Sequence, residues 1–163
     1  MIPTPVVVDG VVYIHGGGPR SSGSLAVRTG GKGDVTKTHV VWSSKEVSSP
    51  PSPVIVDGLM YWVDGSGKAC CADAATGKLR YGEKLPASGR FAVYASVMAA
   101  DGKIYAVTRK GGTFVLAAKP TFQILAHNKF ASDDSDFNGS PAVSARRLFL
   151  RSNRFLYCLK EAP

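Results

Sequence analysis

The sequence predicts an all-β fold of four antiparallel, four-stranded β-propeller blades, with the last blade incomplete. Two observations lead to this prediction. A nine-residue pattern recurs four times, at spacings of 48, 44 and 44 residues, and the chain shows almost no helical periodicity. A period of roughly 44 residues with four short strands is typical of one propeller blade. A β-sandwich is the alternative, but it would not require one turn to return at a constant spacing.

Each copy of the pattern begins with Ser or Thr and is followed by an aromatic residue. Three of the copies carry Asp-Gly at the same place, and the fourth carries Ala-Arg there. The copies cover residues 4–12, 52–60, 96–104 and 140–148, and the aromatic residues that follow are Tyr13, Tyr61, Tyr105 and Phe149.

The second copy shows how one blade is built. Residues 54–56 are a β-branched run that predicts a first strand, and the Asp-Gly after them is the favoured two-residue hairpin turn, because both of its positions need positive φ. Residues 59–63 predict the second strand, and residues 69–72 predict the third after a glycine-containing loop. A further turn leads into a fourth strand at residues 79–81.

We expect a single propeller fragment with blades at about residues 1–48, 49–92, 93–136 and 137–163. The chain starts on a first strand and stops on a third strand, so the fourth blade has no outer strand of its own. Unpaired strand edges favour association. This predicts half of a larger propeller of about eight blades, completed by a second copy in a homodimer or by missing N-terminal blades.

Composition excludes several classes of protein. Hydrophobic residues make up 44% and charged residues 20%, which argues against intrinsic disorder. No apolar run approaches the length of about 20 residues that spans a bilayer, and the N-terminus has no signal-peptide pattern. The net charge of +8 permits an anionic partner, although a basic surface is also simply solvated. Basic and aromatic residues are not interleaved, so we expect no nucleic acid.

Residues 67–78, with the sequence GKACCADAATGK, and residues 52–61 resemble the core and the opening strands of the pyrroloquinoline-quinone (PQQ) repeat. The chain is therefore similar to the PQQ-like propeller family, which includes quinoprotein alcohol dehydrogenases and the outer-membrane assembly lipoprotein. Its last two units resemble the C-terminal blades of uncharacterised bacterial members. The family's repeat ends in a Trp that docks between blades, and this chain has Trp42 and Tyr81 in that role in its first two units.

The resemblance implies a non-enzymatic scaffold or binding module that presents a loop face to a protein or an anionic ligand. The alternative is a fragment of a PQQ-dependent alcohol or sugar dehydrogenase, with PQQ and calcium as its cofactors. Otherwise no cofactor and no catalytic residue is expected. Resemblance also implies a periplasmic or secreted location.

Adjacent cysteines are the first candidate for chemistry. The quinoprotein dehydrogenases hold PQQ against a ring formed by two neighbouring bonded cysteines, and Cys70 and Cys71 are neighbours. The internal alignment instead places Cys71 with Ala26, Val115 and Cys158, which is typical of a small buried strand position. Adjacent strand residues also point to opposite faces, which disfavours a bond between them.

Two surface features complete the candidates. Asp134, Asp136 and Asn138 fit the first half of a calcium loop, but the twelfth position is Ala145 instead of Glu, so an ordinary acidic turn is the alternative. The loops after the second strands carry cations that would form a positive rim on one face of the disc. These predicted ligand-binding residues are Arg20, Lys68, Arg109, Lys110, Arg151 and Arg154.

Overall fold

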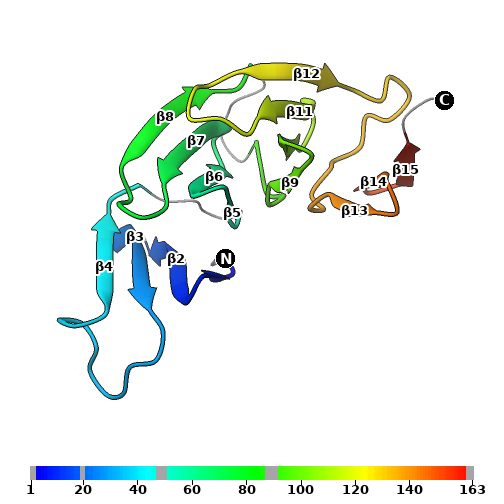
Figure 1. Ribbon diagram of the computed structural model, residues 1–163. Coiled ribbons are helices and arrows are strands. Elements are labelled where there is room, and N and C mark those ends of the chain that lie inside the picture. The colour runs from blue at the N-terminus through cyan, green and yellow to red at the C-terminus, as the bar shows by residue number, and fades with distance from the viewer. Residues whose placement is uncertain (1–2, 19–20, 47–50, 87–91, 161–163) are drawn as a thin grey trace.

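The computed structural model describes residues 3–18, 21–46, 51–86 and 92–160 (Figure 1). These residues form four separate antiparallel sheets that follow one another along an arc. Three of the sheets have four strands and the last has three, and no helix occurs in the described part of the chain. The prediction of an all-β fold with an incomplete last blade is confirmed.

Each sheet is a meander in which consecutive strands pair with one another. The strands of blades 1 and 2 are β1 (Val6–Val8), β2 (Val11–Gly18), β3 (Ser21–Arg28), β4 (Val40–Ser44), β5 (Val54–Val56), β6 (Leu59–Val63), β7 (Lys68–Asp73) and β8 (Leu79–Lys84). Those of blades 3 and 4 are β9 (Met98–Ala100), β10 (Lys103–Thr108), β11 (Gly112–Ala117), β12 (Ile124–Asn128), β13 (Ala142–Ser144), β14 (Arg147–Arg151) and β15 (Leu156–Lys160).

The Asp-Gly turns have the predicted backbone geometry. Asp57 and Gly58 have φ values of 50° and 72°, so both central positions lie in the left-handed region. Ala145 and Arg146, at the same place in blade 4, adopt φ values of 49° and 60°. Residues other than glycine rarely adopt positive φ, so the surrounding sheet must stabilise this backbone conformation.

Strand register makes the repeats equivalent residue by residue. Tyr13 pairs with Ala26, Tyr61 with Cys71, Tyr105 with Val115 and Phe149 with Cys158. This agrees with the predicted alignment of Cys71 with Ala26, Val115 and Cys158. In blades 1 to 3 the same third-strand residue also pairs with a residue of the fourth strand. Ala26 pairs with Trp42, Cys71 with Tyr81 and Val115 with Ala126.

The core lies between the sheets rather than within one of them. One cluster joins blades 1 and 2 around Trp42 and Trp62, a larger one joins blades 2 and 3 around Tyr61 and Phe114, and a smaller one joins blades 3 and 4 around Leu150. Each blade therefore buries its apolar faces only by packing on its neighbours.

Two aromatic side chains close the outer ends of these junctions. The indole Nε1 of Trp42 donates a hydrogen bond to the Ala74 carbonyl of blade 2 at 2.8 Å. Gly77 lies under the same ring, where a Cβ would come within 2.6 Å of the indole. Tyr81 packs edge-to-face on Phe122 of blade 3, with ring centroids 5.5 Å apart. Both aromatic side chains dock on the next blade, and each residue is only 9% exposed.

Candidate functional site

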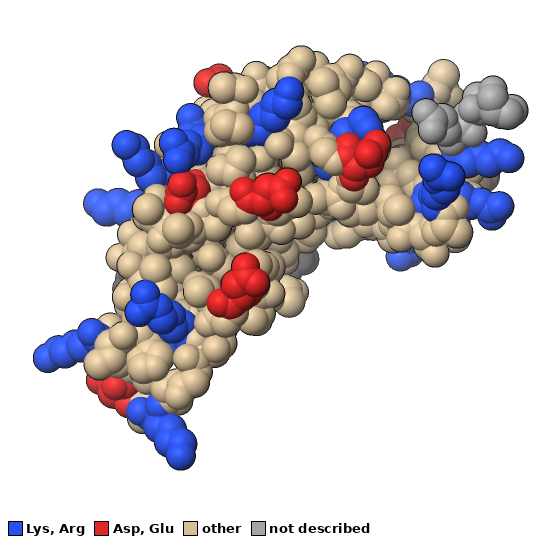
Figure 2. All heavy atoms as spheres, viewed as in Figure 1, with Lys and Arg blue, Asp and Glu red and all other residues tan. Residues whose placement is uncertain are grey.

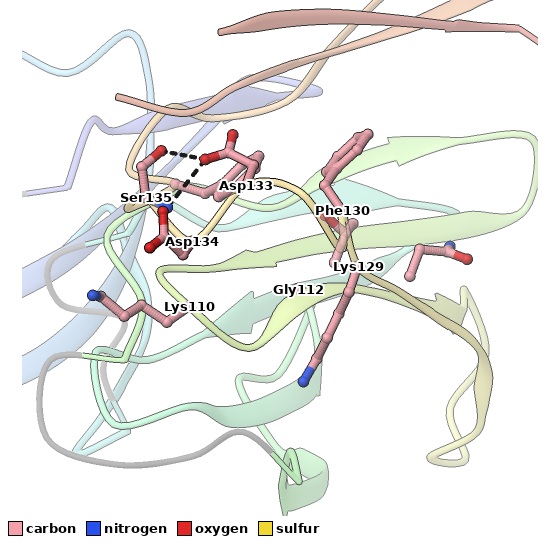
Figure 3. Close-up of a pocket in the computed structure, with 10 residues that line it drawn as sticks. Lys110, Gly112, Lys129, Phe130, Asp133, Asp134 and Ser135 are labelled. Carbon is pink, nitrogen blue, oxygen red and sulfur yellow. Dashed lines mark hydrogen bonds between the residues drawn. The ribbon is translucent and has the colours of Figure 1, made fainter. Parts of the chain in front are cut away.

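The most elaborate polar cluster lies where blade 3 passes into blade 4. The carboxylate of Asp133 accepts hydrogen bonds from the Ser135 hydroxyl at 2.6 Å and from the Ser135 backbone N–H at 3.0 Å (Figure 3). It also accepts one from the Tyr157 hydroxyl at 2.7 Å. The hydrogen bond from the Ser135 hydroxyl is the main reason that the pKa of Asp133 lies well below its usual range. This buried aspartate therefore ties the linker between the blades to β15.

A second cluster joins the linker to the loop after β10. The Arg109 guanidinium pairs with the Asp136 carboxylate and lies over the Tyr94 ring, 5.2 Å from its centroid. The Lys110 ammonium lies 3.6 Å from the same carboxylate. Two of the predicted ligand-binding cations are thus engaged with one aspartate of the predicted calcium loop.

The other predicted cations lie on different loops and have different neighbours. Arg154 pairs with Asp134 at 2.9 Å, and Lys68 lies 3.6 Å from Glu46. Arg151 lines a polar hollow of about 160 Å³ together with Asn138. Arg20 lies outside the described residues. Most of the predicted positive rim is therefore matched by carboxylates, and the loop face carries mixed charge.

These ion pairs bear on the predicted calcium ligands. The carboxylates of Asp134 and Asp136 are held by different arginines, and Asn138 lies near Arg151. No group of three or more His, Cys, Asp or Glu side chains in the described ranges is arranged to hold a metal ion. Calcium binding at these residues stays a prediction.

The adjacent cysteines belong to two different cores. Cys70 packs in the cluster between blades 1 and 2, whereas Cys71 packs in the cluster between blades 2 and 3. Both thiols are free and buried, and burial raises their pKa to about 12 and about 11. The two side chains do not fit a bonded ring that faces PQQ, because the strand directs them to opposite sides. Cys158 is free and exposed.

An apolar pocket between blades 3 and 4 was not predicted from the sequence. Its volume is about 230 Å³, and its lining includes Tyr105, Val115, Phe130, Leu148, Leu150 and Leu159. An alignment of the repeats could have indicated it, because the outer-strand position that holds Trp42 in blade 1 and Tyr81 in blade 2 holds Ala126 in blade 3.

Comparison with known proteins agrees with this architecture. Residues 2–162 match the sequence profile of the family described as outer membrane protein assembly factor BamB. The chain belongs to this family. No curated protein matches the chain at a significant level. In the described residues, we find no helix with the length and hydropathy needed to cross a membrane.

Solved structures show the same fold at low identity. BamB from Moraxella catarrhalis is 16% identical with a TM-score of 0.75, and the match covers 98% of this chain and 46% of that one. The quinohemoprotein alcohol dehydrogenase ADHIIG from Pseudomonas putida HK5 is 15% identical with a TM-score of 0.65, covering 91% and 28%. The chain spans less than half the length of these proteins.

A third similar structure has nearly the length of this chain. The computationally designed Ika4 protein is 9% identical with a TM-score of 0.69, and the match covers 99% of this chain and 92% of the designed one. All three likenesses concern the fold, which a BamB and a dehydrogenase share.

Proposed function

We propose that this member of the BamB family is a non-catalytic propeller scaffold that binds other protein surfaces in the periplasm or outside the cell. Its mixed-charge loop face suits a protein ligand better than a simple polyanion, because Arg109, Lys110 and Arg154 already have carboxylate partners. The BamB profile match and the BamB structure support an envelope location and protein partners.

The observation that carries the proposal is the exposure of sheet faces at both ends of the arc. In blade 2, Tyr61 and Cys71 are buried against blade 3. Their counterparts in blade 4, Phe149 and Cys158, have no described blade beyond them, and Leu156 on the same face is 71% exposed. Exposed apolar faces of this kind mark sites of protein contact.

Blade 1 has a matching exposed face. Tyr13 points to blade 2, so its neighbour Ile14 points away from it, and Val7 lies on the same side through its pairing with Val12. Val7 is 62% exposed and Ile14 is 38% exposed. Either a second copy of the chain or additional blades of a longer parent would cover both end faces and complete a ring of about eight blades.

Light scattering after size exclusion tests self-association. We expect a mass of about twice the 17.2 kDa of one chain, and a return toward the monomer mass in Val7→Glu and in Leu156→Glu. Leu125→Glu is the matched control, since Leu125 is 46% exposed on the bulge of β12 and lies away from both ends. A strictly monomeric wild-type chain at every concentration would overturn completion of the ring by a second copy.

The alternative function, a fragment of a PQQ-dependent dehydrogenase, is favoured by the dehydrogenase structures among the similar folds. The positions of Cys70 and Cys71 count against it. Purified chain mixed with PQQ and calcium discriminates between the two functions. Stoichiometric quinone binding seen by absorbance, with dye-linked oxidation of an alcohol, would replace the scaffold proposal.

A further inference from the structure

The outer end of the junction between blades 3 and 4 lacks the aromatic side chain that closes the two preceding junctions. Trp42 pairs with Ala26, Tyr81 with Cys71 and Ala126 with Val115. In all three sheets the strand register shifts immediately after Ala26, Cys71 or Val115. The three outer-strand positions are therefore equivalent. Trp42 and Tyr81 are buried on the next blade, whereas Ala126 offers only a methyl group.

The apolar pocket lies at this place. Val115 and Asn128 line it, and Ala126 lies on the same sheet face as both, because it is opposite Val115 and two residues from Asn128. The far wall is formed by Leu148 and Leu159 of blade 4. A cavity of about 150 Å³ accepts a benzene ring, so about 230 Å³ is enough for an aromatic side chain.

The edge of β15 is the second feature of the site. The third strands β3, β7 and β11 each pair with a fourth strand, whereas β15 pairs only with β14 in the described part of the chain. In blades 2 and 3 the fourth strand places Leu79 opposite Ala72 and Ile124 opposite Leu116. Leu159 holds the equivalent position in β15 and lines the pocket. A strand added to β15 would therefore place a residue opposite Leu159. One extended strand on β15 therefore directs a side chain into the pocket.

Charge selects the kind of strand. Figure 2 shows basic side chains gathered at the end of the arc where blade 4 lies. Four exposed cations of blade 4 form no ion pair with any described residue. Arg146 lies in the β13–β14 turn, and Arg147, Arg151 and Lys160 lie on β14 and β15. An acidic partner strand would be complementary to them.

We propose that blade 4 binds an extended acidic segment of another protein by β-strand addition on β15, with an aromatic side chain of that segment in the pocket beside Ala126. Backbone hydrogen bonds to the edge give affinity and the pocket gives specificity. The proposal rests on the protein-binding role proposed above and names its site and partner class. It does not require that two copies form a ring.

Fluorescence anisotropy with a labelled synthetic probe tests the proposal on the full chain. The probe is a seven-residue peptide in which glutamates alternate with valine, tryptophan and valine. We expect saturable binding that weakens at least tenfold in Ala126→Trp, because the new indole fills the pocket. Ala75→Trp, at an exposed turn of blade 2, is the matched control and should bind as wild type does.

Probe variants on the unchanged protein keep the test decisive if Ala126→Trp fails to fold. Replacing the probe's tryptophan by alanine should weaken binding at least tenfold, and methylating its alternate backbone nitrogens should abolish it. Absence of wild-type binding, or binding that ignores both Ala126→Trp and these probe changes, would overturn the proposal. Light scattering of the unliganded chain is read separately, so failure of ring completion is distinguishable from failure of this site.

Discussion

The backbone N–H of Ser52 donates a hydrogen bond to the hydroxyl of Ser96 at 2.9 Å and thereby joins the segments that lead into the first strands of blades 2 and 3. The same bond joins Thr4 to Ser52 at 2.8 Å and Ser96 to Ser140 at 2.9 Å. The serine hydroxyl that opens each of the last three repeats thus has one structural role. It satisfies the backbone of the preceding blade at the inner edge of the arc.

Ser96→Ala should lower the free energy of unfolding by about 1 kcal/mol, because the Ser52 N–H loses its acceptor in a partly buried place. Urea denaturation measures this loss. Ser144→Ala is the matched control, since Ser144 is exposed on β13, and it should be neutral. Equal losses in the two variants would contradict a structural role for the bond.

Trp42→Ala should cost roughly 3–5 kcal/mol, because it removes a buried indole from the junction of blades 1 and 2. Trp42→Phe keeps an aromatic ring but loses the hydrogen bond to the Ala74 carbonyl, so its cost should be smaller. Denaturation midpoints of the two variants measure the difference. A Trp42→Ala variant as stable as wild type would show that the indole does not hold the blades together.

The β13–β14 turn offers a stabilising change. Replacing Ala145-Arg146 by Asp-Gly should raise the free energy of unfolding by about 1 kcal/mol, because glycine adopts the observed positive φ without a steric cost. Asp-Ala at the same two positions is the control, since it makes the same change of charge and keeps a Cβ at position 146. If the control stabilises as much as Asp-Gly does, charge rather than backbone conformation is the cause.

Acid should destabilise the chain through His15. Burial lowers the pKa of His15 from 6.5 to about 4, so the unfolded chain binds a proton at pH 5 that the folded chain does not. Stability is therefore complete above pH 6.5 and is lost as pH falls toward 4, with a loss of about 2 kcal/mol at pH 5.

His15→Leu should remove this part of the pH dependence, and thermal unfolding of both proteins at pH 7.5 and pH 5 measures the difference. The ring of His15 contacts Met60 Sδ at 3.1 Å and the Trp62 indole, so the variant also reports on the junction at neutral pH. Parallel pH profiles for the two proteins would exclude His15 as the source.

Thiol labelling should distinguish the three cysteines. We expect Cys158 to react with iodoacetamide in the native chain, and Cys70 and Cys71 to react only after unfolding, because burial raises the pKa of both thiols. Mass spectrometry counts one label per native chain and three per denatured chain. Native labelling of all three would show that the junctions open readily.

The sequence could predict the features that recur with each blade. The Asp-Gly turns and the aromatic residues two positions after each second strand begins depend on local geometry. Their spacing therefore predicts the strands, the sheet order and the burial of Cys71. Local signals do not specify which charges meet. Arg109 and Asp136 are 27 residues apart and pair only because the linker folds back over blade 3. The pocket beside Ala126 likewise depends on how two blades pack, because it forms where the methyl group of Ala126 replaces a large aromatic side chain.

The hydrogen bonds from Thr4 to Ser52, from Ser52 to Ser96 and from Ser96 to Ser140 also bear on how such an array can change in length. Each joint uses one backbone donor and one hydroxyl that the repeat itself carries, so a duplicated unit brings both halves of its own joint. Whole blades can then be gained or lost by recombination without new inner contacts having to arise. The serine hydroxyl at the start of repeats 2 to 4 is in this sense what makes the units interchangeable.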